Sequence, residues 1–340
     1  MKAVAYYDPG AIDENEVLVD LDLPEPEPTG RDLLVEVRAV SVNPIDTKVR
    51  RGVAPQMGPA EQAKVLGWDA AGVVTATGPD ARLFQPGDEV WYAGEIMRPG
   101  SNAERQLVDE RIVGCKPRSL DFEQAAALPL TTITAWELLF ERLGVAPGKN
   151  PDAGSLLIVG AGGGVGSILV QLAARLTGLD VIATASRPET AEWVKSLGAH
   201  AVLDHSRPLS AELERAGLAA PYYAASLTHT DTHLDEIVAC LAPQGRLALI
   251  DDPPELDVTK LKPKCLSLHW ELMFTRSLFA TPDIIAQHRL LDEAAQLVDA
   301  GVLRSTLQER FGRINATNLQ RAHAVLESGR SRGKIVLSGF

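Results

Sequence analysis

The first part of the chain shows short hydrophobic runs separated by turn residues. Residues 33–40 and 70–77 are largely apolar and strand-like, and a Gln-Pro-Gly-Asp turn at 85–88 precedes the apolar run 89–92. Short runs at turn-bounded spacing are typical of strands. The pattern therefore predicts a β-rich, barrel-like domain over residues 1–125.

From about residue 155 the pattern changes to strands that alternate with helices. The apolar run 155–159 enters a glycine cluster, and the next segment, 165–176, has helical spacing. Pro188 opens another helix and Gly198 closes it. The remaining predicted elements are strand 181–185, strand 201–203, helix 209–216, strand 222–226, helix 233–241, strand 246–250, a strand after Cys265, a helix near 282–301 and a closing strand 333–337. This alternation predicts a doubly wound α/β domain, with a parallel sheet covered on both faces.

Composition narrows the class of protein. The chain has 340 residues, with 45 acidic against 33 basic residues and a net charge of −12, which argues against nucleic acid or an anionic membrane as its main partner. The apolar runs are too short to span a membrane, and residues 1–8 predict a strand rather than a signal peptide. The three cysteines are far apart and form no disulfide framework. We therefore expect a cytoplasmic enzyme.

The glycine cluster at 160–166 carries the clearest chemical signal. A strict G-x-G-x-x-G starting at Gly160 fails because its sixth residue is Val165, but Ala161-x-Gly163-x-x-Gly166 fits a variant of this motif. Its position between a strand and a helix predicts that backbone N–H groups bind the pyrophosphate of a dinucleotide. The alternative is a glycine-rich turn without a ligand. The residues expected to contact the cofactor here are Gly160, Gly163, Gly164, Val165 and Gly166.

The end of the second strand indicates which dinucleotide binds. A carboxylate there would bond the ribose 2′-OH of NAD, but Ser186 and Arg187 stand about twenty residues beyond Gly166. Asp180 lies at the start of that strand, on the wrong side. A hydroxyl and a guanidinium suit a phosphate dianion, which favours NADP(H). The alternative is that Ser186 caps the next helix and Arg187 is solvated.

Several segments together resemble a known superfamily. They are residues 42–48, 67–74 and 128–137, the glycine cluster and the closing residues 333–336. On these segments the chain resembles the medium-chain dehydrogenase/reductase superfamily and is similar to its zinc-free quinone oxidoreductases. The resemblance implies a GroES-like catalytic domain formed by residues 1–126 and 274–340, with a Rossmann NADP-binding domain at 127–273. A quinone or carbonyl compound would bind between the two domains.

The metal ligands of related alcohol dehydrogenases are missing. By resemblance, a catalytic zinc would need a cysteine in the first segment and Gly-His-Glu in the second, where this chain has Asn43, Asp46 and Trp68. A structural zinc would need four cysteines near 92–113, and this stretch has none. We expect Asp69 to bond backbone N–H groups at a strand start. We therefore predict no metal.

One further segment, His229-Thr230-Asp231-Thr232-His233, has two histidines at a metal-like spacing. We interpret it as a loop that leads into a helix, with Asp231 or Thr232 as the N-cap, since both residue types favour that position.

The resemblance also implies roles for single residues. It places Asn43 near the nicotinamide ribose and substrate, and His205 near the 2′-phosphate. Lys48 occupies a position where related reductases have a tyrosine, and Tyr92 is a further candidate proton donor. The alternatives are a turn residue for Asn43, a solvated side chain for Lys48 or His205, and a core position for Tyr92. Further cofactor contacts are implied for Thr132, Thr228 and Ile250.

The combined prediction is an NADPH-dependent reductase of quinones or α,β-unsaturated carbonyls that works without zinc. The alternatives are a zinc-dependent alcohol dehydrogenase with atypical ligands, or a non-catalytic NADPH-binding protein. The apolar strand 266–270 is expected at a sheet edge, which predicts a homodimer. Its physiological substrate depends on loops 50–64 and 95–102, which sequence patterns do not fold.

Overall fold

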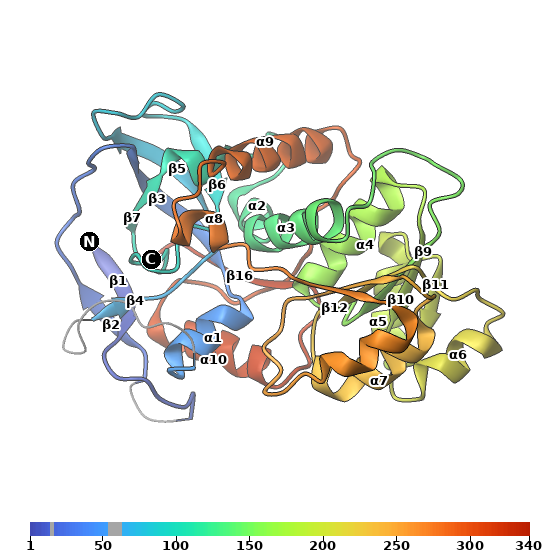
Figure 1. The fold of residues 1–340 in the computed structure, drawn as a ribbon. Helices are drawn as coiled ribbons and strands as arrows, with labels where there is room; N and C mark the ends of the chain where they lie inside the picture. Colours follow the sequence, from blue (N-terminus) through green and yellow to red (C-terminus); the bar gives the residue numbers. More distant parts are fainter. Residues whose placement is uncertain (14–16, 54–62) are drawn as a thin grey trace. The chain divides into compact units, whose positions relative to one another are not determined.

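The computed structural model describes residues 1–13, 17–53 and 63–340. These residues form two compact units. Unit 1 contains Met1–Ile133 and Phe274–Phe340, and unit 2 contains Thr134–Met273 (Figure 1). Most of the loop predicted at 50–64 lies outside the described residues.

Unit 1 is built around a sheet with the order β15-β16-β3-β5-β6-β8, and β7 also pairs with β3. Its strands are β3 (Asp32–Ser41), β5 (Ala70–Thr77), β6 (Glu89–Tyr92), β7 (Arg105–Asp109), β8 (Val113–Cys115), β15 (Leu307–Arg310) and β16 (Lys334–Ser338). A smaller sheet has the order β2-β1-β4, from Val19–Asp22, Lys2–Tyr6 and Lys64–Val65. A Cβ on Gly72 would lie 2.2 Å from Glu36 O, so glycine lets β5 approach β3. The predicted β-rich domain is confirmed.

Helices cover and connect these strands. They are α1 (Pro44–Arg50), α2 (Phe122–Ala126), α8 (Thr275–Leu278), α9 (Ile285–Asp299) and α10 (Ala316–Glu327). Helix α9 packs on β8, and α10 packs on α1. Asp121 begins α2 by accepting the Gln124 N–H at 2.7 Å.

Unit 2 contains a wholly parallel sheet with the order β11-β10-β9-β12-β13-β14. The strands are β9 (Ser155–Val159), β10 (Asp180–Thr184), β11 (Ala201–Leu203), β12 (Tyr223–Ser226), β13 (Arg246–Leu249) and β14 (Ser267–Trp270). The strand order reverses between β9 and β12, which is the Rossmann arrangement with its ligand-binding switch point. The predicted doubly wound fold is confirmed, and β14 lies at the sheet edge as expected.

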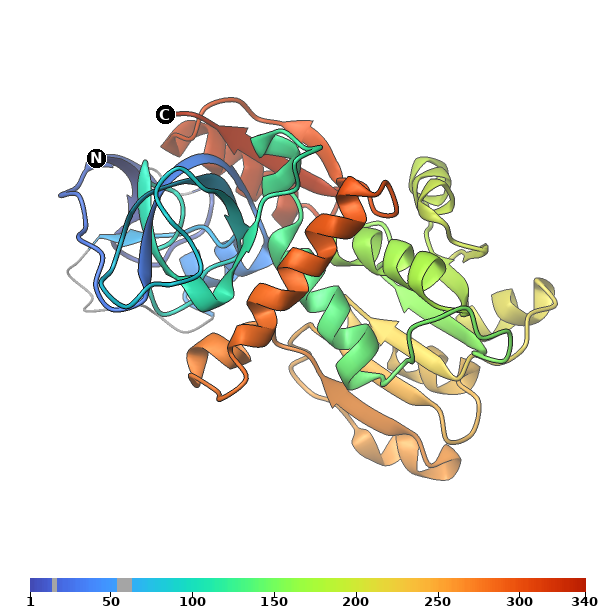
Figure 2. The same ribbon diagram turned by 90° about the horizontal axis from the view of Figure 1, so that it is seen from above.

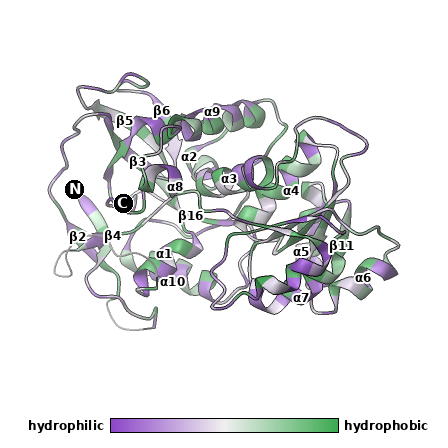
Figure 3. Ribbon diagram, viewed as in Figure 1, coloured by the Kyte–Doolittle hydropathy of each residue, from purple (hydrophilic) through white to green (hydrophobic). Residues whose placement is uncertain are grey.

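Four helices named in Figure 1 connect the strands of unit 2: α4 (Gly164–Leu176), α5 (Pro188–Leu197), α6 (Leu209–Arg215) and α7 (Thr230–Cys240). Figure 2 shows the same connections from above. Helices α5 and α7 carry purple hydrophilic residues beside green hydrophobic ones in Figure 3, as expected for helices that bury one face. Within the described residues, no helix is long and apolar enough to cross a membrane.

Helix α3 (Pro129–Trp136) contains the division between the two units, which falls after Ile133. The domain bounds expected from the sequence stay predictions. Leu130 N–H donates to Asp69, and Thr306 donates to Ala127 O. Helix α7 already begins at Thr230 with His229 as N-cap, so Asp231 or Thr232 as N-cap was wrong.

Candidate functional site

The glycine turn between β9 and α4 has the geometry of an anion site. Gly160 has φ +85°, a conformation that L side chains rarely adopt. A Cβ on Gly166 would lie 2.5 Å from Ala161 Cα, whereas one on Gly163 would meet only Gly160 O, at 3.6 Å. The N–H groups of Gly164, Val165 and Gly166 have no recorded partner in the described part of the chain. The turn therefore leaves donors exposed at the positive end of a helix.

Neighbouring elements hold this turn in place. Gly160 N–H donates to Thr184 Oγ1 at 3.3 Å, from the last residue of β10. On the helix side, Trp193 Nε1 of α5 donates to Ser167 Oγ at 2.8 Å. Thr228 also packs here, since its Cγ2 is 2.9 Å from the position of a Cβ on Gly160. Contacts from β10, from α5 and from the loop after β12 thus fix the turn before any ligand binds.

Ser186 and Arg187 follow β10 at the carboxyl edge of the sheet. Arg187 is the N-cap of α5 and is half-buried, while Ser186 is exposed and does not occupy the N-cap position. Asp180 is the first residue of β10 and therefore lies at the amino ends of the parallel strands. Because carboxyl ends of parallel strands share one edge, His205 after β11 and Ile250 after β13 lie at the same edge as Ser186. The first carboxylate after β10 is that of the exposed Glu189, whose Oε1 lies 3.8 Å from Arg187 Nε.

Unit 1 contains a buried cluster of polar groups that we call the Lys334 cluster: Asn43, Asp46, Asp69 and Lys334. Lys334 Nζ donates to Asp69 Oδ2 at 2.9 Å, to Val42 O at 3.0 Å and to Asn43 Oδ1. The other oxygen of Asp69 accepts the Leu130 N–H at 2.8 Å, which confirms the expected backbone bond. The sequence analysis did not propose Lys334 as a site residue, although Gly333-Lys334 lies in one of the segments that resemble the superfamily.

Asn43 is held by the other members of this cluster and by two backbone carbonyls. Its Nδ2 donates to Asp69 Oδ2 at 2.9 Å and to the Ser41 and Trp68 carbonyls, both at 3.3 Å. Its backbone N–H donates to Asp46 Oδ2 at 2.6 Å, and the residue is 1% exposed. The amide is therefore committed to internal partners, and direct contact with substrate or cofactor stays a prediction.

Burial controls the acidity of the two carboxyl groups. Desolvation raises the pKa of Asp46 to about 7. The Asn43 N–H and the Lys334 charge lower this pKa, but their effect is smaller than that of burial. Desolvation also raises the pKa of Asp69, against the same lysine and the Leu130 N–H. The Lys334 charge thus lowers the pKa of both carboxyl groups, while their desolvation raises it.

A catalytic zinc does not fit the residues of this cluster. The Lys334 ammonium already contacts Asp69, and Trp68 is fully buried with its Nε1 donating to Glu95 O at 3.1 Å. Among residues 1–13, 17–53 and 63–340, no group of three or more His, Cys, Asp or Glu side chains could hold a metal. Asp69 Oδ2 and Asn43 Oδ1 already accept from the Lys334 ammonium, whereas zinc sites need several nitrogen, sulfur or oxygen ligands around an open centre.

The remaining predicted residues are Thr132, Tyr92 and Lys48. Thr132 is buried in unit 1 and its hydroxyl has no partner within the described ranges. Tyr92 ends β6, is fully buried, and its hydroxyl likewise has no recorded partner there; burial raises its pKa. Lys48 is half-buried in α1. Their proposed roles stay predictions.

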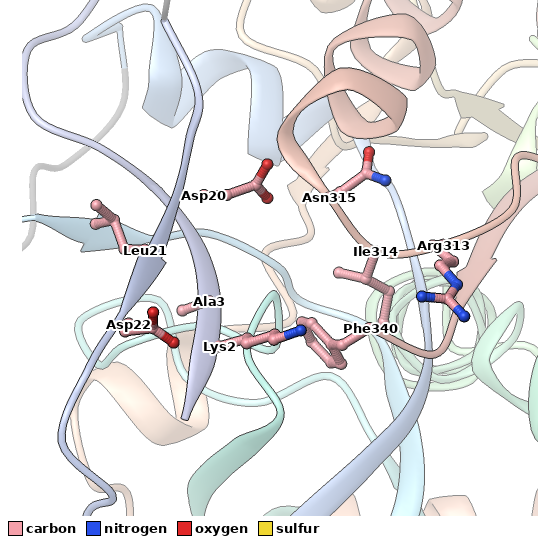
Figure 4. Close-up of a pocket in the computed structure, with 9 residues that line it drawn as sticks. All are labelled: Lys2, Ala3, Asp20, Leu21, Asp22, Arg313, Ile314, Asn315 and Phe340. Carbon is pink, nitrogen blue, oxygen red and sulfur yellow. The ribbon is translucent and has the colours of Figure 1, made fainter.

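Unit 1 also has a hollow of about 340 Å³ that is lined by side chains of both charges (Figure 4). The cations Lys2 and Arg313 line it together with Asp20 and Asp22. Asp20 Oδ1 accepts the Ala316 N–H at 2.9 Å at the start of α10. None of the predicted site residues lines this hollow.

Known proteins match this chain over nearly its whole length. A model of the alcohol dehydrogenase GroES-like domain matches residues 29–125, and a zinc-binding dehydrogenase model matches 197–337. A zinc-type alcohol dehydrogenase-like protein of Staphylococcus aureus is 37% identical over 99% of this chain and 100% of its own length.

Solved structures show the same fold. A candidate zinc-dependent alcohol dehydrogenase from Rhizobium etli is 58% identical, with a TM-score of 0.94 over 100% of this chain and 98% of that one. A quinone oxidoreductase from Pseudomonas syringae is 26% identical, with a TM-score of 0.83 over 99% of each chain. Both similarities extend across unit 1 and unit 2.

Proposed function

The chain belongs to the medium-chain dehydrogenase/reductase superfamily of oxidoreductases, and from that premise we propose that it is an NADPH-dependent reductase of quinones or α,β-unsaturated carbonyls. The observation that carries the proposal is the carboxyl edge of unit 2. There the N–H groups of the glycine turn have no recorded partner among the described residues, and Ser186 and Arg187 follow the end of β10. The first carboxylate after this strand, Glu189, is exposed and pairs with Arg187 at 3.8 Å.

Different residues of unit 2 bind the two phosphate groups of the dinucleotide. The N–H groups at the start of α4 bind the pyrophosphate, and Arg187 with Ser186 binds the 2′-phosphate. The nicotinamide supplies the hydride when it is bound, so the protein has to orient the substrate and exclude competing reactions. A reduced quinone takes its protons from water, which makes a dedicated acid optional.

Zinc takes no part in the proposed reaction. Although the Staphylococcus aureus relative is called zinc-type, the Lys334 ammonium of this chain contacts the carboxylate that follows Trp68. The Lys334 cluster instead fixes Asn43 and the start of α1. The quinone class is supported by the Pseudomonas syringae quinone oxidoreductase with the same fold.

We also propose that the protein is a homodimer. Strand β14 is an edge strand, and Trp270 at its end is 51% exposed. An open edge with an exposed aromatic side chain favours pairing with a second copy. Sedimentation equilibrium that gives a monomer at every concentration would contradict this.

Steady-state oxidation of NADPH and NADH against quinones, enones and aldehydes tests the reductase proposal. We expect NADPH to be oxidised faster than NADH with at least one quinone or enone. Tight NADPH binding with no oxidation by any acceptor would instead support the non-catalytic alternative. Activity that requires added zinc would support the alcohol dehydrogenase alternative.

A further inference from the structure

Two buried glutamates of unit 2 lie close to the same arginine, and neither belongs to a site described so far. Glu271 follows β14, Glu137 begins η2 (Glu137–Arg142), and both side chains are fully buried. Arg142 Nε donates to Glu271 Oε2 at 2.8 Å, and Arg142 Nη2 lies 3.8 Å from Glu137 Oε2. We call these three residues the Glu271 cluster. It contains two carboxyl groups and one guanidinium group.

The backbone of η2 brings Glu137 and Arg142 together. This segment follows α3 directly and is a π-helix, in which the Leu143 N–H donates to Leu138 O at 2.9 Å. In an α-helix, side chains five residues apart would point about 140° away from each other, because each residue turns the helix by about 100°. The wider π turn brings them back to one side, and such turns are rare and often lie at functional positions. Strand β14 packs on this segment.

The charges that face Glu271 include more carboxyl groups than cations. They are those of Arg142, Glu137 and Glu141. Glu141 is exposed, and its Oε2 lies 4.0 Å from Arg142 Nη1. One guanidinium group therefore serves two buried carboxyl groups and one exposed carboxylate.

The neighbouring strands add no free cation to the cluster in the part of the chain that the structure describes. Arg246 of β13 donates to Leu143 O at 2.9 Å. His269 of β14 lies with its Nε2 3.1 Å from Ser267 Oγ. Burial, followed by the charges of Arg246 and Arg142, lowers the pKa of His269, so this ring stays neutral. Arg142 is thus the cation on which both buried glutamates depend.

The contact between the two carboxyl groups requires a proton. Burial raises the pKa of Glu271, although the Arg142 charge and a hydrogen bond with Glu137 lower it. An ionised carboxylate only accepts hydrogen bonds, so one member of a bonded pair must be protonated. Among the described residues, no N–H or hydroxyl group donates to Glu271 Oε1. The acid proton of Glu137 is the donor available to that oxygen.

We propose that Glu137 and Glu271 share one proton, and that this proton holds the carboxyl end of β14 on η2. When it is lost as the pH rises, two buried carboxylates repel each other beside a single guanidinium group, and the end of β14 separates from η2. The device lies within unit 2. It depends neither on the proposed reductase activity nor on the proposed homodimer.

The direction of the pH effect follows from the raised pKa of Glu271. Its ordinary value is 4.5 and its folded value is higher, so between these two values the folded chain binds more protons than the unfolded chain. The stabilisation is therefore complete below pH 4.5 and is lost as the pH rises through the folded pKa. One proton corresponds to an increase in the opening equilibrium of up to about tenfold per pH unit.

Infrared difference spectra of the full chain detect the shared proton directly. A protonated carboxyl group has a carbonyl stretch that a carboxylate lacks, and ordinary glutamates are ionised at about pH 6. Wild type minus Glu137→Gln should show one such band at this pH. Glu141→Gln is the matched control, because this exposed carboxylate lies near the same arginine and should leave the band unchanged. A wild-type spectrum that matches Glu137→Gln would overturn the proposal.

Hydrogen exchange at two backbone amides tests whether the proton holds the strand. The Glu271 N–H donates to Leu249 O at 3.0 Å and the Leu143 N–H donates to Leu138 O, so these amides report on the end of β14 and on η2. Wild type should lose about tenfold or more of its protection relative to Glu137→Gln between about pH 6 and about pH 8. Comparison at equal pH removes the intrinsic pH dependence of exchange.

The shared proton and the holding of β14 fail in different ways. If the carbonyl band is absent from wild type, both parts of the proposal are wrong. If the band is present but protection in wild type and Glu137→Gln depends on pH in the same way, the proton does not hold β14. Should Glu137→Gln not fold, Glu271→Gln removes the same proton, and the Leu143 amide then serves as the reporter.

Discussion

Lys334 Nζ lies 2.9 Å from Asp69 Oδ2, and the side chains of this pair are only 3% and 0% exposed. The bond joins the closing strand β16 to the segment that precedes β5, and Asn43 bonds to both partners. A buried ion pair that also satisfies an amide leaves an uncompensated charge when one partner is removed. The pair thus connects the C-terminal part of unit 1 to its N-terminal part.

Lys334→Met should lower the free energy of unfolding by about 3–5 kcal/mol, because it leaves Asp69 buried without its cation. Urea unfolding monitored by circular dichroism measures this. Lys260→Met is the control, since its ion pair with Asp235 is exposed and should contribute little. Adding Asp69→Asn to Lys334→Met should recover part of the loss, and a double variant as unstable as the sum of the single variants would contradict the pairing.

The buried histidine of α10 makes the protein sensitive to acid. His323 is fully buried, neither ring nitrogen has a partner among the described residues, and burial followed by the Arg50 charge lowers its pKa to about 3. Its folded pKa lies below the ordinary value of 6.5, so its contribution to stability is complete above pH 6.5 and decreases as the pH falls toward 3.

We therefore expect His323→Leu to reduce the loss of stability between pH 6.5 and lower pH. Unfolding free energies of wild type and variant, compared at neutral pH and near pH 5, give the result. If the difference between the two proteins is independent of pH, the histidine does not titrate on unfolding as described.

Two glycines of the same turn should respond differently to alanine. Gly166→Ala forces a Cβ to within 2.5 Å of the Ala161 backbone, so the turn must move and both thermal stability and dinucleotide binding should fall. At Gly163 the nearest protein atom is 3.6 Å away, so Gly163→Ala should fold normally yet weaken NADPH and NADH alike by tenfold or more, because the methyl group occupies the path of the pyrophosphate. Thermal unfolding and calorimetry separate the two effects. Equal behaviour of both variants would be evidence against a phosphate site at this turn.

Arg187→Ala should change the choice of cofactor. Loss of a charge-assisted bond to the 2′-phosphate is worth about 1.5–3 kcal/mol, which corresponds to a weakening of NADPH binding of about 10-fold to 150-fold. NADH binding should change less than twofold, since it carries no group for this side chain. Arg207→Ala, an exposed arginine of the same unit, is the control. If NADPH and NADH weaken equally, Arg187 does not recognise the 2′-phosphate.

The sequence predicted local patterns well and long-range contacts poorly. Strand–helix alternation predicted the doubly wound parallel sheet, and helix α5 begins at Pro188 and ends before Gly198 as expected. The N-cap of α7 was missed because His229 adopts a left-handed conformation that residue preferences do not indicate. The Lys334 bond to Asp69 spans 265 residues, so no periodicity or spacing could bring the two together. The predicted contact of Asn43 with the nicotinamide ribose and substrate stays a prediction, and its bond to the distant Lys334 was not anticipated.

The proposal that this reductase works without zinc is tested most directly by the metal content of the active enzyme. Protein produced with excess zinc is analysed for bound metal, and its NADPH-dependent turnover of a quinone is measured before and after treatment with a chelator. The zinc-free mechanism predicts far less than one zinc per chain and the same turnover after chelation. The reason is that the Lys334 ammonium already bonds Asp69 and Asn43. One tightly bound zinc per chain, with turnover lost to the chelator and restored by zinc, would contradict it.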